Sequence, residues 1–285
     1  MSGARTALVV GAASGMGRAT ALRLARDGWA VAAADRDAAR LDGLDEELRG
    51  AGAHAALTVT LDLAGGETVV EAAVAEVVAA LGPPWLLAVA AGVLEGGLAL
   101  DAGHDHYARV LAVNFHGVVQ ANVAAARAMA AAGTGGRIVN WSSNNAAGGT
   151  AGFSAYAASK AAMEAFSRSL ALELGPDGIT VNTIRPGSVR TPMLGALTQR
   201  EVDEENARIP LGRFGAPEDA AGLVAFLASD DAAWITGADI ALDGGTLAAR
   251  GRAGVGAVRA RLEREAERVA EAGGDAGGGG AAGGG

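Results

Sequence analysis

Near its amino terminus the chain reads Arg5-Thr6-Ala7-Leu8-Val9-Val10-Gly11-Ala12-Ala13-Ser14-Gly15-Met16-Gly17. The apolar run over residues 5–10 predicts a strand, and a helix is predicted over 15–27. Glycines between a strand and a helix permit a tight turn and a close approach of the backbone to a pyrophosphate, whose charge the helix N-terminus stabilises. In a chain with 44 glycines, this position gives the motif its weight. We interpret the turn as dinucleotide-binding, through Gly11, Ser14, Gly15, Met16 and Gly17.

The alternation of short apolar runs and longer helical stretches continues along the chain. Further strands are predicted near 30–35, 55–61, 85–90, 136–142, 179–184 and 238–242. Helices are predicted near 37–50, 66–81, 101–131, 154–175 and 217–228. Residues 191–212 are expected to form a loop with helical pieces. Strands that alternate with helices are typical of βαβ units, so the sequence predicts an α/β fold with a parallel sheet.

The pattern changes after Gly245. Residues 250–271 carry six arginines and four glutamates around a thin apolar stripe, and residues 273–285 are nearly all glycine and alanine. We therefore predict one catalytic domain over 1–249 and an extension over 250–285. The extension would begin as a solvated helix and end as a flexible tail. A partner-binding role for the helix stays open.

Composition excludes several classes of function. A net charge of −9 argues against a nucleic-acid surface, and the absence of cysteine excludes disulfides, thiolate catalysis and cysteine-ligated metal. No secretory signal is visible, and Glu71 and Glu76 interrupt the longest apolar helical stretch. His104 and His106 have no obvious third ligand, so they are expected to face solvent and no metal site is predicted. We expect a soluble, cytoplasmic protein with neither a nucleic-acid nor a membrane partner.

The chain contains one lysine, Lys160, against 22 arginines, and it follows one of the two tyrosines, Tyr156, by four residues. Where arginine is accepted almost everywhere, a retained lysine indicates a need for its compact ammonium. Residues four apart share a helix face, so the ammonium could lower the pKa of the phenol, ordinarily about 10, and fit it for proton transfer near neutral pH. A surface Tyr–Lys pair is the plain alternative, and the pair alone does not decide between them.

Two aspartates follow predicted strands. Asp35 stands 18 residues after Gly17, where a carboxylate can accept hydrogen bonds from the adenosine ribose and repel a 2′-phosphate, which favours NAD over NADP. Arg36 could instead bind that phosphate, so NADP stays the less favoured cofactor. Asp62 could accept the adenine amino group. Either aspartate could also cap the helix that follows it.

Polar residues also stand where a ligand would be expected. Asn114 lies in an otherwise apolar helical stretch, and a buried asparagine needs hydrogen-bond partners. Ser142 and Ser143 close the predicted fifth strand, and the carboxyl ends of strands in an open parallel sheet are where ligands bind.

Together these residues resemble the short-chain dehydrogenase/reductase family in its single-domain form, from Arg5 to about Thr246. The resemblance rests on Gly11, Gly15, Gly17, Asn114, Ser143, Tyr156-x-x-x-Lys160 and Arg185-Pro186-Gly187-Ser188-Val189-Arg190-Thr191. Three later stretches are also similar to the family: Pro217-Glu218-Asp219, Ile235-Thr236-Gly237 and Asp243-Gly244-Gly245. It implies a Rossmann-like, doubly wound parallel sheet of about seven strands flanked by helices, and a homo-oligomer, by family resemblance a homotetramer. It also selects Ser143 over Ser142, because the family's active serine stands 13 residues before the tyrosine.

The resemblance implies an NAD(H)-dependent oxidoreductase that interconverts a secondary alcohol and a ketone. Tyr156 would be the general base in oxidation and the general acid in reduction. Ser143 would hydrogen-bond the substrate oxygen, Lys160 would lower the pKa of Tyr156 and bind the nicotinamide ribose, and Asn114 would hold a water that connects Lys160 to solvent. The cofactor would also contact Leu63, Ala90, Ala91, Gly92, Pro186, Gly187, Val189 and Thr191. The substrate would lie against Asn145, Phe153, Met193 and Leu194.

The sequence leaves two other functions to consider, and it departs from the family's usual residues at two places. A non-catalytic dinucleotide-binding regulator or scaffold is the alternative, and the intact Ser-Tyr-Lys-Asn set argues against it. An enoyl reductase is disfavoured, because that branch spaces its tyrosine and lysine more widely. Val89-Ala90-Ala91-Gly92 stands where the family usually has Asn-Asn-Ala-Gly, and Val10 where it has threonine. The hydrogen bonds of the two lost amides must be replaced or forgone.

Overall fold

Seven parallel strands form one sheet in the order β3-β2-β1-β4-β5-β6-β7, within residues 4–249 and 263–264, which the computed structural model describes. The strands are β1 (Thr6–Val10), β2 (Ala30–Asp35), β3 (Ala55–Thr60), β4 (Leu86–Val89), β5 (Gly136–Trp141), β6 (Ile179–Pro186) and β7 (Asp239–Leu242). Every predicted strand is confirmed, as is the Rossmann-like, doubly wound α/β architecture.

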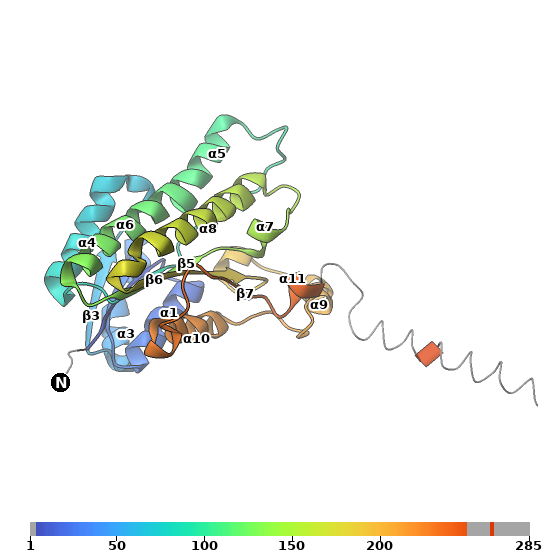
Figure 1. Cartoon of the computed structure of the whole chain (residues 1–285). Coiled ribbons are helices and arrows are strands. Elements are labelled where there is room, and N and C mark those ends of the chain that lie inside the picture. Colours follow the sequence, from blue (N-terminus) through green and yellow to red (C-terminus); the bar gives the residue numbers. More distant parts are fainter. Residues whose placement is uncertain (1–3, 250–262, 265–285) are drawn as a thin grey trace, which may run out of the picture.

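Helices cover both faces of the sheet (Figure 1). One face carries α1 (Gly15–Arg26), α3 (Leu44–Ala51) and α10 (Pro217–Ala228). The other carries α4 (Glu67–Leu81), α5 (His104–Leu111), α6 (Val118–Ala132) and α8 (Ser154–Leu174). Between strands and major helices lie α2 (Ala38–Leu41), α7 (Asn144–Ala147), α9 (Gln199–Arg208) and α11 (Thr246–Ala249). The connections also contain the short 3-10 turns η1 (Leu63–Gly65), η3 (Gly175–Asp177), η4 (Pro192–Leu194) and η5 (Asp230–Ala232).

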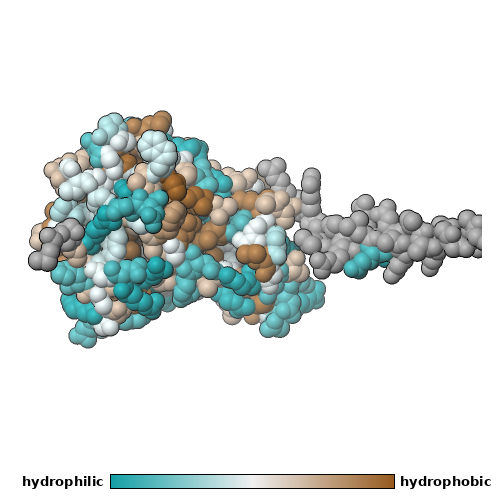
Figure 2. Space-filling view, turned by 60° about the horizontal axis from the view of Figure 1, so that its bottom comes forward, coloured by the Kyte–Doolittle hydropathy of each residue, from teal (hydrophilic) through white to brown (hydrophobic). Residues whose placement is uncertain are grey.

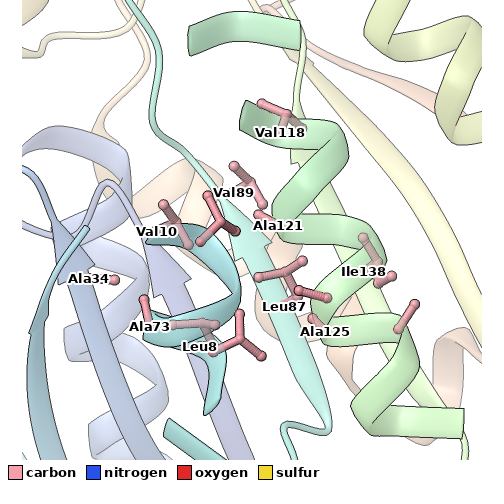
Figure 3. Close-up of a cluster of buried hydrophobic side chains, with 14 of the residues drawn as sticks. Leu8, Val10, Ala34, Ala73, Leu87, Val89, Val118, Ala121, Ala125 and Ile138 are labelled. Atoms are coloured by element: carbon pink, nitrogen blue, oxygen red, sulfur yellow. The ribbon is translucent and has the colours of Figure 1, made fainter. Parts of the chain in front are cut away.

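The core is built from alanine and branched aliphatic side chains on both faces of the sheet. On one face, Leu8, Leu87 and Ile138 of the strands pack with Ala121 and Ala125 of α6 (Figure 3). Alanine on the helix lets its backbone approach the sheet closely, so a core with few aromatic residues still fills its space. A second cluster packs α1, α3 and α10 against the opposite face.

The order of the strands reverses between β1 and β4, which is where an open sheet of this kind forms a ligand crevice. Main-chain bonds hold the two strand ends together: Ala90 and Ala91 donate their N–H groups to Val10 O at 2.8 and 3.1 Å. Main-chain pairing of this kind needs no particular side chain, so it holds β4 beside β1 without side-chain amides at Val89 and Ala90.

Two predicted helices differ from the structure. The helix predicted over 37–50 is split into α2 and α3, because Gly43 adopts φ +71° between them. The helix predicted over 101–131 begins at His104, after Gly103, and contains a π-helical segment, η2 (Ala112–Gly117), between α5 and α6. A π-segment shifts the register of the side chains on a helix and often marks a functional site.

The loop predicted over 191–212 contains η4 and α9, as expected. The prediction of an extension over 250–285 falls outside the described residues, apart from 263–264. Across the described part of the chain, no helix combines the length and the apolarity that a membrane span requires.

Candidate active site

A cavity of about 360 Å³ opens at the carboxyl ends of the first strands. This volume is in the range of sites that hold small molecules or cofactors. The cavity brings together most residues predicted for the cofactor: Gly11, Ser14, Gly15, Met16, Gly17, Asp35, Arg36, Asp62, Leu63, Ala90, Ala91, Gly92 and Thr191. Its wall also contains Ala13, Asp37, Arg40 and Pro192, which the sequence analysis did not single out.

The glycine turn brings backbone into close contact with the start of α1. A Cβ added to Gly17 would lie 2.1 Å from Gly11 O, which no real side chain can approach. Ser14 precedes the helix without a side-chain capping bond, so its hydroxyl does not occupy the N–H groups of the first turn. These N–H groups and the positive end of the 12-residue helix face the cavity wall and suit a phosphate. The residues present therefore fit a dinucleotide.

Asp35 is fixed above the glycine turn by two main-chain donors. Ala13 N–H donates to its Oδ2 and Asp37 N–H to its Oδ1, each at 3.1 Å. Arg36 lies beside it on the cavity wall, and Arg40 pairs with Asp37 at 3.2 Å. Asp62 both lines the cavity and caps η1, since its carboxylate accepts from Ala64 N–H at 2.9 Å. The capping role and the cofactor role are therefore compatible for Asp62.

Tyr156 lies in the first turn of α8, and 9% of its surface is exposed. Burial raises the pKa of its phenol above the ordinary value of 10.0, and a hydrogen bond with the Ser143 side chain lowers it by less. Ser143 precedes α7, and its hydroxyl accepts from Asn145 N–H at 3.2 Å. The net direction is opposite to the one expected from Lys160, because desolvation of the phenolate has the largest effect on the pKa of Tyr156.

Lys160 is buried, with 3% of its surface exposed, and its Nζ donates to Trp141 O at 2.7 Å. The ammonium lies 5.8 Å from the centre of the Tyr156 ring. Burial lowers the pKa of Lys160 to about 8, while the charge of Glu164 raises it. A surface Tyr–Lys pair is therefore excluded: both side chains are in the interior.

Asn114 is fully buried in the π-segment, and its partners are of the kind that a buried asparagine needs. Its Oδ1 accepts from Val93 N–H at 2.8 Å, and its Nδ2 donates to Val93 O at 2.9 Å and to Ser159 Oγ at 3.2 Å. A Cβ added to Gly92 would lie 3.2 Å from Asn114 Oδ1 and 3.3 Å from Lys160 Nζ. Gly92 thus joins the cavity wall directly to Asn114 and Lys160.

The residues predicted for the substrate are placed less uniformly. Phe153 precedes α8 and pairs with Gly97 of the β4–α5 loop. Asn145 accepts a hydrogen bond from Thr150 at 2.9 Å. Met193 and Leu194 are exposed on η4, and Met193 also lines the cavity.

Five residues predicted for the cofactor do not line the cavity: Tyr156 and Lys160 of α8, and Pro186, Gly187 and Val189. Pro186 ends β6, Gly187 donates its N–H to Leu242 O at 3.0 Å, and Val189 is buried in a bridge to Gly215. Pro186 and Gly187 thus lie beside β7, and Val189 lies beside Gly215, which precedes α10.

A buried polar cluster behind the site was missed by the sequence analysis. Ser142 is 4% exposed and donates to Glu164, whose carboxylate also accepts from Arg185. Ser142 is therefore engaged away from the site, whereas Ser143 lies against Tyr156. The available signal was Glu164 itself, a charged residue in an otherwise apolar helical run, four residues after Lys160.

The two histidines on α5 differ in their surroundings. His104 is exposed, but His106 is partly buried, with Nδ1 3.6 Å from Glu95 Oε2. Among residues 4–249 and 263–264 there is no group of three or more His, Cys, Asp or Glu side chains that could hold a metal ion.

Comparison with known proteins reveals close relatives. A family model described as enoyl-(acyl carrier protein) reductase matches residues 11–246. The (3R)-3-hydroxyacyl-CoA dehydrogenase of Canis lupus familiaris is 39% identical over 248 residues, covering 84% of this chain and 95% of that protein. The 3-oxoacyl-acyl-carrier-protein reductase FabG of Pseudomonas aeruginosa is 37% identical over 241 residues, covering 85% and 96%. A short-chain type dehydrogenase/reductase from Mycobacterium ulcerans superposes with a TM-score of 0.82 at 34% identity, covering 88% of this chain and 91% of that one.

Proposed function

This chain belongs to the short-chain dehydrogenase/reductase family, and on that basis we propose that it is an NAD(H)-dependent oxidoreductase that interconverts a secondary alcohol and a ketone. Proteins of this family are oxidoreductases that use nicotinamide dinucleotides. The specific reaction, the choice of nucleotide and the roles of the residues are the proposal.

One observation gives the main support for this proposal. Gly92 forms part of the cavity wall, and a Cβ at this position would lie 3.2 Å from Asn114 Oδ1 and 3.3 Å from Lys160 Nζ. Lys160 is one helical turn from Tyr156, which interacts with Ser143. A cofactor in the cavity would therefore lie beside a proton donor, an ammonium and a hydroxyl that converge from α8 and β5.

The roles follow from the chemistry of these groups. Tyr156 transfers the proton between its phenol oxygen and the substrate oxygen, as acid in reduction and as base in oxidation. Ser143 donates a hydrogen bond to the substrate oxygen, where negative charge develops. Lys160 supplies a positive charge and donors for ribose hydroxyls, and Asn114 fixes the main chain at Val93 above it. The nicotinamide supplies or accepts the hydride when the dinucleotide is bound.

For the substrate, the named relatives favour a 3-hydroxyacyl or 3-oxoacyl thioester as the first class to test. The assay follows NADH absorbance with 3-hydroxybutyryl-CoA, acetoacetyl-CoA and a panel of cyclic and aromatic secondary alcohols and ketones. Crotonyl-CoA tests the enoyl reduction that the family description suggests. We expect turnover at the C–OH or C=O group and none with crotonyl-CoA. Turnover of crotonyl-CoA alone would identify an enoyl reductase, and NADH binding without any turnover would favour the regulator.

The geometry of Asp35 supports NAD over NADP. Its carboxylate is held by two N–H groups at the cavity wall, so it cannot easily turn away from a 2′-phosphate. We expect NADH to bind at least about tenfold more tightly than NADPH, about 1.4 kcal/mol, in fluorescence titrations. Asp35→Ala should narrow the difference, whereas Asp42→Ala, an exposed aspartate outside the cavity wall, should not. Equal affinities in the unmodified protein would mean that Arg36 dominates.

Two further expectations remain proposals: a homo-oligomer, tetrameric by family resemblance, and a cytoplasmic location. Apolar side chains gather in a band between hydrophilic areas on the face seen in Figure 2. Large exposed apolar residues in the described chain include Trp234, Leu172 and Leu211. Exposed side chains of this kind are what subunit contacts bury.

A further inference from the structure

Glu164 places a carboxylate in the interior of the protein one helical turn beyond Lys160. It is 5% exposed and accepts three hydrogen bonds from two residues. Arg185 of β6 donates through Nε at 2.8 Å and through Nη2 at 2.7 Å, and Ser142, which directly follows β5, donates through its hydroxyl. This arrangement is specific, because a two-pronged guanidinium–carboxylate pair fixes both partners in orientation as well as in distance.

Lys160 needs a counter-charge, because its ammonium is buried as deeply as Glu164. On α8, Tyr156 stands four residues before Lys160 and Glu164 four residues after it. Asn114 approaches from η2, and Trp141 O of β5 accepts a hydrogen bond from the ammonium. The phenol, the amide and the carbonyl carry no full charge at neutral pH. Burial lowers the pKa of Lys160 to about 8, and Glu164 is the group that opposes this by raising it. An isolated buried ammonium would be neutralised more readily.

The charges continue outward with alternating sign. Arg185 Nη2 lies 3.5 Å from Asp239 Oδ2 of β7, and Asp239 also binds Thr183 and the half-exposed Arg168. Arg185 thus neutralises a carboxylate on each side. Glu164 is paired directly with Arg185 and stands one helical turn from Lys160 on α8, so its influence on Lys160 depends on Arg185 as well.

We propose that Glu164 is a positioning residue: its carboxylate keeps the buried ammonium of Lys160 charged and ties α8 to the end of β5 that carries Ser142 and Ser143. The contribution of Glu164 to turnover rests on the proposed function. The effect of Glu164 on the charge of Lys160 is independent of that function and can be measured without a substrate.

The single lysine of the chain makes the test unambiguous. Full-length protein labelled with 13Cε-lysine gives one NMR signal, whose chemical shift follows the protonation of Lys160 as pH is raised. We expect Glu164→Gln to lower the midpoint by at least about one pH unit, a tenfold loss of proton affinity. Glu164→Asp, which keeps the negative charge, should restore most of the proton affinity of Lys160. Glu173→Gln, an exposed glutamate of the same helix, is the matched control and should leave the midpoint unchanged.

Arg185→Gln is an independent variant that should shift the Lys160 midpoint in the opposite direction. Removing the guanidinium leaves more of the Glu164 charge to act on Lys160, so the midpoint should rise. In steady-state assays of ketone reduction, the alkaline limit of kcat should move to lower pH in Glu164→Gln, because Lys160 loses its charge earlier as pH rises. An unchanged Lys160 midpoint in folded Glu164→Gln overturns the proposal, and so does a lowered midpoint in Arg185→Gln. If Glu164→Gln fails to fold, the Lys160 midpoints of Glu164→Asp and Arg185→Gln decide whether the proposal holds.

Discussion

Replacing Tyr156 by phenylalanine is expected to lower kcat about 10³-fold or more, with the fold and NADH binding retained. The substitution removes only the phenol oxygen of a side chain that is 9% exposed, so the packing of the ring is preserved. Positioned acid–base groups contribute about 10²–10⁴-fold to rate, and Tyr156, which α8 brings beside Ser143, is the proposed acid–base group. Steady-state kinetics in both directions measure kcat, thermal melting tests whether the fold is retained, and titration measures the binding of NADH.

The chain contains a second tyrosine that serves as the matched control. Tyr107 lies on α5, and its hydroxyl is 3.1 Å from Ser154 Oγ, so Tyr107→Phe removes the same atom and also breaks one hydrogen bond. It should leave kcat within about threefold of the unmodified protein. Near-normal turnover in Tyr156→Phe, or equal losses in both variants, would remove Tyr156 from the chemical step.

The raised pKa of Tyr156 sets the expected pH dependence. Reduction needs the protonated phenol, which persists through neutral pH because burial holds its pKa above 10.0. Oxidation needs the phenolate, so its kcat/KM should climb as pH rises and should not level off at neutral pH. The opposing hydrogen bond comes from Ser143, so Ser143→Ala should move the oxidation profile to still higher pH.

The sheet and the glycine turn could be predicted from sequence because their signals are local. Each strand is a short apolar run, and Gly11 and Gly17 mark the one place where α1 must approach the backbone of the turn. Within the proposed catalytic set, Tyr156 and Lys160 were singled out by their spacing on one helix, whereas the choice of Ser143 rested on the family resemblance. The members of the set are close in space because α8 packs directly on β6 and on the π-segment.

The remaining features depend on contacts between distant residues, which periodicity does not reveal. Glu164 is bound by residues 21 and 22 positions away, so its neutralisation follows from the packing of α8 against β5 and β6. The direction of the Tyr156 pKa was predicted from Lys160 alone. Depth of burial decides it, and depth is a property of the folded chain. The π-segment at Asn114 likewise has no apolar periodicity that distinguishes it from an ordinary helix.

Replacing Lys160 by arginine is expected to lower kcat at least about 10²-fold although the charge is kept. The ammonium donates to Trp141 O at 2.7 Å, and Gly92 is so close that even a Cβ there would lie 3.3 Å from Nζ. A planar guanidinium is wider than an ammonium, so it must push either Gly92 and the cavity wall or Asn114 out of place. Such overpacking costs about 1–3 kcal/mol, less than the about 5–15 kcal/mol that stabilises a typical domain, so the fold should survive with a lower Tm.

Arginine differs from lysine at this position in a second way: it stays charged at every accessible pH, whereas the pKa of Lys160 is about 8. If Lys160 acted only as a fixed positive charge, the arginine variant would keep its turnover and lose only the alkaline limit of its pH profile. If the compact ammonium must fit between Gly92, Asn114 and Trp141 O, turnover falls at every pH and NADH binding weakens with it. Arg190→Lys, an exposed exchange in the opposite direction, controls for the change of side-chain type. Unmodified kcat and NADH affinity in Lys160→Arg would show that charge alone is required and that the position of Lys160 beside the cavity wall has no catalytic consequence.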